Sequence, residues 1–283
     1  MDSSRKEVFE IKNFPRYLYK YFGLGERTER IITSNEIYFA NPTKFNDPFD
    51  FKLPIDFNRS IRKLEKEDFV FYLKNLKEDL KNENNEISKE DLPRIKEILN
   101  SGDVDSIAEK LLNITPGLKG EIKKIFNNVG VCCFSKEYDN ILMWSHYAQA
   151  HEGICLKFDR TEDSNFFSQI VNVEYRKRVE TDIAKYFLEY YKFSGDTIST
   201  KYSDWSYEKE VRVIKTESMD FNCNNRFVKF EPSALKEIIF GVKTKKSTIS
   251  HYIDLCKNNK NITFSKMRLL KNGRFELKKI PIK

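Results

Sequence analysis

Short segments of strand character lie on both sides of one long helical stretch, and this arrangement constrains the fold most strongly. Residues from about 60 to 128 are rich in Lys and Glu, nearly free of Gly, and follow a helical period. The flanking segments are short, and they are either apolar or alternate between apolar and polar residues, which is typical of strands. The sequence therefore predicts a single α+β domain over residues 1–283. Its mixed or antiparallel sheet would carry a charged helical insertion at about 60–128.

The expected elements outside the insertion are short and closely spaced. The loop at residues 43–51 contains three Phe side chains, so we expect it to pack against the core. Asp139 or Asn140 is expected to cap the helix that follows it. Strands are predicted at residues 16–23, 36–42, 130–135, 153–159, 170–175, 210–215, 226–230 and 237–243, and helices at 26–35, 139–151, 179–193 and 246–259. Segments 263–270 and 274–280 close the chain.

The composition indicates a folded protein with a heavily charged surface. Hydrophobic residues make up 40% of the chain, which is enough for a core and excludes an intrinsically disordered chain. The net charge of +7 would favour approach to a nucleic acid or a nucleotide. The Lys side chains are dispersed, however, and most of them are expected to face solvent.

The sequence lacks the motifs of several kinds of functional site. The five Cys form no CxxC motif and no cluster with His, so we expect no metal site and buried thiols in a reducing cytosol. No GxGxxG or GxxxxGK[ST] motif occurs, which argues against a Rossmann cofactor site and a P-loop. No signal-like or membrane-length apolar segment occurs, so we expect a cytoplasmic protein without a membrane partner.

Four clusters of polar and aromatic residues are candidates for a functional site. Each cluster has a simpler explanation as core packing, a turn or solvated charge, but four of them in one chain favour a site. The clusters are Tyr17, Tyr19, Lys20 and Tyr21; Asn46, Asp47 and Asp50; Ser135, Trp144, His146 and Tyr147; and Trp205, Tyr207, Glu208, Glu210 and Arg212.

Glu208 and Glu210 are separated by one residue where the predicted strand 210–215 begins. Residues i and i+2 of an extended segment point to the same face, and two carboxylates on one face repel each other. A fold that keeps them there either leaves them in water, paired with Lys209 or Arg212, or uses them. We expect the second arrangement, with both carboxylates at the mouth of a cleft between two sheets.

Three segments resemble a widespread bacterial family named domain of unknown function 2971. They are Tyr19–Asp50, Cys133–Asp159 with its sequence NILMWSHYAQAHEGICLKFD, and Trp205–Ile214 with WSYEKEVRVI. Together they frame most of the chain outside the insertion and the tail. The resemblance implies membership of this family but no particular activity.

The order of motifs is also similar to that of the ADP-ribosyltransferase fold. Enzymes of that fold place a polar or aromatic residue on a first strand, a Ser or Tyr near a second, and a Glu-x-Glu motif at the start of a later strand. Here the order is Tyr19 and Lys20, then Ser135, then Glu208 and Glu210. The Arg or His that well-known subclasses carry on the first strand is replaced by Lys20 or Tyr19. The resemblance implies a split sheet and NAD as a substrate.

The same resemblance implies a role for each candidate residue. Glu210 would hold a ribose hydroxyl and stabilise the positive charge that develops when the glycosidic bond of NAD breaks. Glu208 would orient or deprotonate the acceptor, and Ser135 completes the predicted catalytic set. The acceptor would be a macromolecule, with DNA and RNA as candidates, in a toxin or phage-defence setting. Residues expected to bind NAD are Tyr19, Lys20, Tyr21, Asn46, Asp47, Trp144 and Tyr147, with aromatic stacking and Lys20 near the pyrophosphate.

Three other readings stay open at this point. A non-catalytic module that binds nucleic acid or a nucleotide would use the net positive charge of the chain and the aromatic clusters. A metal-dependent hydrolase would use Asp47, Asp50, Glu208 and Glu210, whose carboxylates suit Mg²⁺. A purely structural or partner-binding protein would present the charged insertion as its binding surface.

Overall fold

The fold was established from a computed structural model of the chain, which describes residues 14–51, 127–178, 197–216, 221–259 and 261–282. Apart from residues 127 and 128, the helical insertion predicted at about 60–128 lies outside the described residues, and so does the helix predicted at 179–193. Within the described residues, no helix combines the length and the apolar character needed to cross a membrane.

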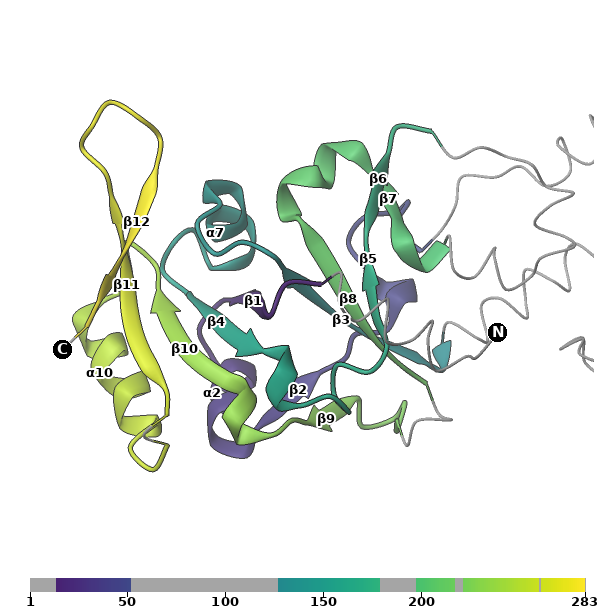
Figure 1. Cartoon of the computed structure of the whole chain (residues 1–283), viewed down its shortest axis with the longest axis horizontal. Coiled ribbons are helices and arrows are strands. Elements are labelled where there is room, and N and C mark those ends of the chain that lie inside the picture. Colours follow the sequence, from purple (N-terminus) through teal and green to yellow (C-terminus); the bar gives the residue numbers. More distant parts are fainter. Residues whose placement is uncertain (1–13, 52–126, 179–196, 217–220, 260, 283) are drawn as a thin grey trace, which may run out of the picture.

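One eight-stranded sheet dominates the described part of the chain (Figure 1). Its strand order is β12-β11-β10-β4-β1-β3-β8-β5, and neighbouring strands are antiparallel except for the parallel pair β10 and β11. The prediction of an α+β fold with a mixed, mostly antiparallel sheet is therefore confirmed. The strands are β1 Tyr17–Phe22, β3 Val129–Ser135, β4 Ile154–Asp159, β5 Ile170–Asn172, β8 Glu210–Thr216, β10 Leu235–Phe240, β11 Thr263–Leu269 and β12 Leu277–Pro281.

Two small strand pairs and short helices complete the described residues. The antiparallel pair is β2 Glu36–Tyr38 with β9 Phe227–Lys229, and the parallel pair is β6 Glu174–Arg176 with β7 Thr200–Tyr202. The α-helices are α2 Glu26–Ser34, α7 Ile141–Tyr147 and α10 Lys246–Leu255. Short 3₁₀ helices are η1 Pro42–Lys44, η2 Arg160–Glu162, η3 Ser203–Glu208 and η5 Pro232–Ala234.

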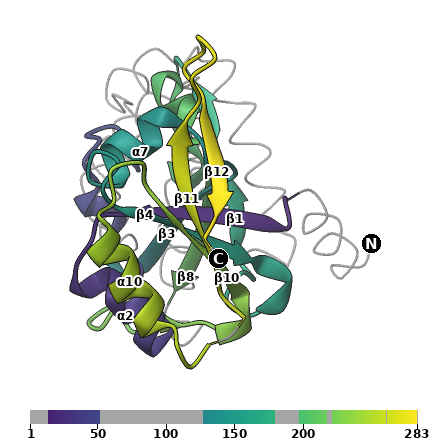
Figure 2. The same ribbon diagram turned by 90° about the vertical axis from the view of Figure 1, so that its left-hand side faces the viewer.

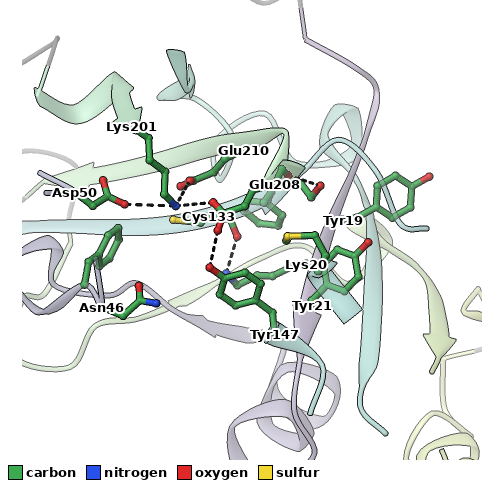
Figure 3. A pocket seen from close by; sticks show the side chains of 14 residues that line it. Tyr19, Lys20, Tyr21, Asn46, Asp50, Cys133, Tyr147, Lys201, Glu208 and Glu210 are labelled. Carbon is green, nitrogen blue, oxygen red and sulfur yellow. Dashed lines mark hydrogen bonds and ion pairs between the residues drawn. The ribbon is translucent and has the colours of Figure 1, made fainter. Parts of the chain in front are cut away.

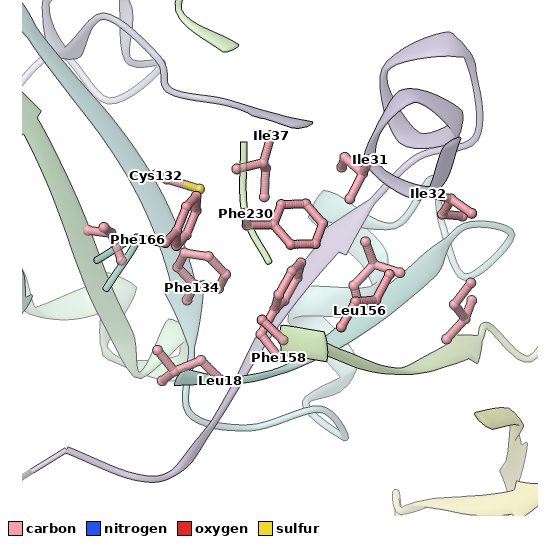
Figure 4. Packing of buried hydrophobic residues seen from close by; sticks show 14 of the residues in the cluster. Leu18, Ile31, Ile32, Ile37, Cys132, Phe134, Leu156, Phe158, Phe166 and Phe230 are labelled. Atoms are coloured by element: carbon pink, nitrogen blue, oxygen red, sulfur yellow. The ribbon is translucent and has the colours of Figure 1, made fainter. Parts of the chain in front are cut away.

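The alternation within β1 distributes its side chains to two hydrophobic clusters on opposite faces of the sheet. Successive side chains of a strand point to opposite faces. Leu18 belongs to the larger cluster, together with Phe158 of β4 and Ile31 of α2 (Figure 4). Tyr21 belongs to the second cluster, which contains Trp144 of α7. Figures 1 and 2 show α2 and α10 side by side at one end of the molecule, away from α7.

The sheet is only weakly joined between β1 and β3. Strand β1 pairs with β4 along its whole length, and β3 pairs with β8 in the same way. Between β1 and β3 the register is limited to Tyr19 opposite Ser135. Beyond this point the Lys20 ammonium donates a 2.6 Å hydrogen bond to the carbonyl oxygen of Cys133, which satisfies a β3 carbonyl with a side chain instead of a neighbouring strand. The junction therefore leaves room for a cavity.

The helix predicted at 139–151 is shorter than expected. The side chain of Asn140 caps it by accepting hydrogen bonds from the backbone N–H groups of Leu142 and Met143, as predicted. It ends at Tyr147, and residues 149–151 then adopt positive φ angles. This tight reversal returns the chain to Gly153, where an added Cβ atom would lie 2.1 Å from the Phe22 carbonyl oxygen. Only Gly allows such a close approach of β4 to the end of β1.

Three other elements differ from the sequence prediction. The strand predicted at 170–175 is divided into β5 and β6, which belong to different sheets, because the Val173 N–H turns to the Glu210 carbonyl oxygen. The strand predicted at 36–42 ends at Tyr38. In the loop at 43–51, Phe51 is buried as expected, whereas Phe49 is 59% exposed.

Candidate functional site

A cavity of about 190 Å³ lies at the junction between β1 and β3 (Figure 3). Strand β1 contributes Tyr19, Lys20 and Tyr21, and Ser135 lies at the end of β3. Asn46 comes from the loop after η1. The remaining predicted site residues on its wall are Tyr147 from α7, Glu208 from η3 and Glu210 from β8. The structure therefore brings together eight predicted site residues from distant parts of the sequence.

Asp47 and Trp144, the other two predicted site residues, do not line this cavity. Asp47 Oδ1 accepts a 2.8 Å hydrogen bond from the Phe49 N–H, which is the pattern of an Asx turn. Trp144 is completely buried, and its indole N–H donates to the Tyr138 carbonyl oxygen at 2.8 Å. Asp47 therefore shapes the loop, and Trp144 supports α7 from the core rather than offering a stacking face.

The electrostatic centre of the site is the Lys201 ammonium, which the sequence did not single out. It lies 2.5 Å from Glu208 Oε2, 2.9 Å from Glu210 Oε2 and 3.6 Å from Asp50 Oδ2 (Figure 3). All four side chains are nearly buried. Burial alone would lower the pKa of Lys201, but the three carboxylates outweigh it and raise that pKa, so the amine stays charged.

Arg212 forms a second cationic contact behind the carboxylates. Its side chain is fully buried, and its Nε donates to Glu210 Oε1 at 2.7 Å while its Nη2 donates to both oxygens of Asp50 at 2.9 and 3.0 Å. Burial favours protonation of Glu210, but the charges of Arg212 and Lys201 outweigh it and hold the pKa of Glu210 well below its usual range. Glu210 therefore stays ionised, with both oxygens engaged by cations.

The pKa of Glu208 is shifted in the opposite direction from that of Glu210. Its Oε1 accepts a 2.5 Å hydrogen bond from the Tyr147 hydroxyl, and its Oε2 faces Lys201. Burial, assisted by repulsion from Glu210 and opposed by Lys201, raises the pKa of Glu208 to about 6. Two neighbouring carboxyl groups with pKa values moved apart are the usual arrangement for a proton-exchanging group beside a fixed charge.

The backbone brings Glu208 and Glu210 together in a way that the sequence prediction did not anticipate. They are not successive same-face residues of one strand, because Glu208 ends η3 and Glu210 begins β8. Lys209 between them adopts a left-handed conformation with φ of 46° and is exposed. Ser135 Oγ donates to the Glu208 carbonyl oxygen at 2.7 Å, and the Glu210 N–H donates to the Tyr175 hydroxyl at 2.7 Å. The convergence of the two carboxylates was predicted correctly, but its geometric reason was wrong.

The side chain of Ser135 forms hydrogen bonds with the protein backbone. Its hydroxyl donates to the Glu208 carbonyl oxygen and accepts from the Glu137 N–H at 3.1 Å, and the residue is 1% exposed. Ser135 therefore fixes the backbone of Glu208 from the end of β3. The Tyr21 hydroxyl makes a related contact by donating to the Glu137 carbonyl oxygen at 3.0 Å.

The Lys201 ammonium occupies the point at which Asp50, Glu208 and Glu210 converge, which is where a divalent cation would have to sit. Among residues 14–51, 127–178, 197–216, 221–259 and 261–282, no group of three or more His, Cys, Asp or Glu is arranged to hold a metal ion. Of the four carboxylates in the hydrolase hypothesis, Asp47 lies outside the cavity lining and the other three are already paired with Lys201 and Arg212. The geometry therefore does not favour that hypothesis.

Comparison with known protein families gives one match. Residues 143–213 match the model of a family described as protein of unknown function DUF2971. This segment is similar to DUF2971. This match confirms the resemblance predicted from the sequence, and it runs from α7 to β8, so that it includes Tyr147, Lys201, Glu208, Glu210 and Arg212. The β1 side of the cavity lies outside the DUF2971 match. No curated protein and no solved structure matches the chain.

Proposed function

We propose that this protein binds NAD in the cavity between β1 and β3, cleaves its nicotinamide–ribose bond, and transfers the ADP-ribose group to a macromolecule. The observation that supports this proposal is the meeting of Tyr19, Ser135 and Glu210 at one cavity. These residues occupy the three places in the chain that the ADP-ribosyltransferase resemblance requires. The weak junction between β1 and β3 agrees with the split sheet that the resemblance implies.

The charge of the cluster suits this reaction. With Glu208 ionised, the three carboxylates of Asp50, Glu208 and Glu210 exceed the two cations Lys201 and Arg212 by one negative charge. The transition state for glycosidic cleavage carries positive charge on the ribose, as in glycoside hydrolysis. A buried negative cluster with fixed orientation stabilises such a charge without reorganising. Glu210, which stays ionised, would supply this stabilisation.

Glu208 would act as the base in the same reaction. A nucleophilic oxygen or nitrogen of the acceptor, or of water, attacks C1′ of the nicotinamide-bearing ribose. The bond from C1′ to the nicotinamide nitrogen breaks, and its electron pair leaves with neutral nicotinamide. The proton of the nucleophile passes to Glu208, whose pKa of about 6 leaves it mostly ionised at neutral pH and able to accept a proton.

The residues of β1 and α7 would hold the nucleotide. Tyr19 and Tyr147 line the cavity and would stack on nicotinamide or adenine. Lys20 lines it as well, and its ammonium would exchange the Cys133 carbonyl oxygen for a pyrophosphate oxygen. DNA and RNA are the acceptors that the basic surface favours, and modification of nucleic acid would fit a toxin or phage-defence role.

The direct test is nicotinamide release from NAD, followed by chromatography, with and without DNA, RNA and cell lysate. The wild-type protein should release nicotinamide, and Glu210→Gln should lower the rate by about 100-fold or more. Glu152→Gln, which alters an exposed carboxylate outside the cavity, is the matched control and should act like wild type. If no condition gives nicotinamide and NAD does not raise the melting temperature, the proposal fails.

A non-catalytic nucleotide-binding or nucleic-acid-binding module is the second candidate, and the state of Glu210 favours it. Both oxygens of this carboxylate are bonded to Arg212 and Lys201, so a ribose hydroxyl would have to share them. Such a module would bind NAD or an oligonucleotide and raise the melting temperature without releasing nicotinamide.

A further inference from the structure

A β-hairpin formed by β11 and β12 ends in an exposed, preformed turn. The turn is held by the Arg274 N–H, which donates to Asn272 Oδ1 at 3.1 Å, and by Gly273 at a φ of 79°. Phe275 follows directly and is 96% exposed, more than any other large apolar side chain among the described residues. Figures 1 and 2 show the closed end of this hairpin projecting from the sheet and pointing away from α10 and α2.

The hairpin is strongly cationic around this ring. Arg268, Lys271, Arg274 and Lys278 are all exposed, against one acidic side chain, Glu276. Arg268 and Lys278 lie directly opposite each other in the antiparallel register of β11 and β12. Like charges in this position repel and destabilise the strand pair. A polyanion bound along the hairpin would remove that repulsion.

We propose that the β11–β12 hairpin binds single-stranded nucleic acid, with Phe275 stacking on a base and the four cations contacting phosphates. Aromatic side chains beside positive charge are the usual means of binding single strands, because every base offers a face for stacking. An unpaired base is needed here because Phe275 is the single aromatic ring of the turn and can stack only on a base whose face is free. This inference does not depend on NAD cleavage, since the hairpin lies outside the cavity lining.

The composition of the turn favours nucleic acid over a lipid surface. Phe275 lies between Arg274 and Glu276, and Asn272 and Gly273 form the rest of the tip. Membrane-binding segments instead present a broad apolar face beside their basic residues. A single exposed ring on a hairpin that carries four exposed cations suits one base and its neighbouring phosphates better than a lipid surface.

The test measures the binding of a fluorescein-labelled 20-nucleotide thymidine oligomer by fluorescence anisotropy at several salt concentrations. Wild type should bind with an affinity that falls as salt rises. Phe275→Ala should weaken binding by about tenfold or more through lost stacking. The double variant Arg268→Ala/Lys278→Ala should weaken binding and reduce the slope of log K against log salt by about 1.4. Lys257→Ala, which removes an exposed cation just after the C-terminal end of α10, is the control and should bind like wild type.

Three results would overturn the inference. The first is that wild type does not bind the oligomer even at low salt. The second is that the hairpin variants bind as tightly as wild type. The third is that wild type binds phosphatidylserine vesicles in preference to the oligomer and that Phe275→Ala loses this binding. Misfolding does not confuse these outcomes, because Phe275, Arg268 and Lys278 are exposed and their variants should melt at the wild-type temperature.

Discussion

Glu208 and Glu210 share the ammonium of Lys201, at 2.5 Å and 2.9 Å respectively, although one ends a 3₁₀ helix and the other begins a strand. The cation removes most of the repulsion that would otherwise separate two buried carboxylates. Because Arg212 contacts only Glu210 of the two, the pKa of Glu210 is lowered while that of Glu208 is raised to about 6. This difference underlies the roles assigned to the two residues.

Replacing Lys201 with Met should destabilise the fold strongly. The change would leave Asp50, Glu208 and Glu210 close together with only Arg212 to balance them, and the loss of one member of a buried ion pair costs about 3–5 kcal/mol. Urea unfolding at pH 7 measures the cost. Lys236→Met, which removes a partly exposed ion pair with Glu162, is the control and should cost less than about 1 kcal/mol. Equal effects of the two changes would refute the central role of Lys201.

The stability that depends on Glu208 should change between pH 4.5 and pH 6. Its pKa is about 6 in the folded state and 4.5 as the reference value, so folding favours the protonated form. The contribution is therefore fully present below pH 4.5 and is lost as pH rises through 6. The free energy of unfolding of wild type minus that of Glu208→Gln should fall by about 1.3 kcal/mol over this range, out of a total of about 2 kcal/mol between strongly acidic and neutral pH.

This pH dependence is measured by urea unfolding of both proteins at half-unit intervals. Glu210 contributes in the opposite direction, since its lowered pKa gives stability that is lost only as pH falls below 4.5. Subtracting the Glu208→Gln curve separates the two groups above that pH. A difference that stays constant from pH 4.5 to pH 7 would contradict the raised pKa of Glu208.

Ser135→Ala should act on stability through the backbone of Glu208. The hydroxyl of Ser135 satisfies the Glu208 carbonyl oxygen and the Glu137 N–H, and the residue is buried. Leaving such groups without a partner costs about 1–3 kcal/mol. Ser206→Ala, an exposed Ser of η3, should change stability by less than about 0.5 kcal/mol. If Ser135→Ala is as stable as wild type, Ser135 does not position Glu208 and a direct role with a ligand becomes the better explanation.

Local pattern was enough to predict the strands that form the site. Alternation and apolar runs predicted β1, β3, β4 and β8 to within about two residues, and the Asn140 side chain identified the start of α7. These features depend on periodicity and capping within a few residues, which a single sequence displays directly. The order of the motifs was then sufficient to place eight predicted residues on one cavity.

The features missed depend on contacts between distant residues. In the sequence, Lys201 resembles an ordinary surface lysine. It is buried because β7 pairs with β6 and is followed directly by η3, which lies beside the carboxylates. The division of the strand at 170–175 follows from the hydrogen bond between Val173 and Glu210, which the local pattern does not contain. Trp144 was predicted to stack on the nucleotide, but it is buried in the hydrophobic cluster that contains Tyr21 and Cys155.

The most direct test of the central claim is the initial rate of nicotinamide release from NAD by wild type and by Glu210→Gln between pH 5 and pH 8. The account predicts a wild-type rate that rises with half of its increase near pH 6, as Glu208 loses its proton, and a Glu210→Gln rate lower by about 100-fold or more at every pH. Equal rates for the two proteins, or no nicotinamide from either, would contradict it.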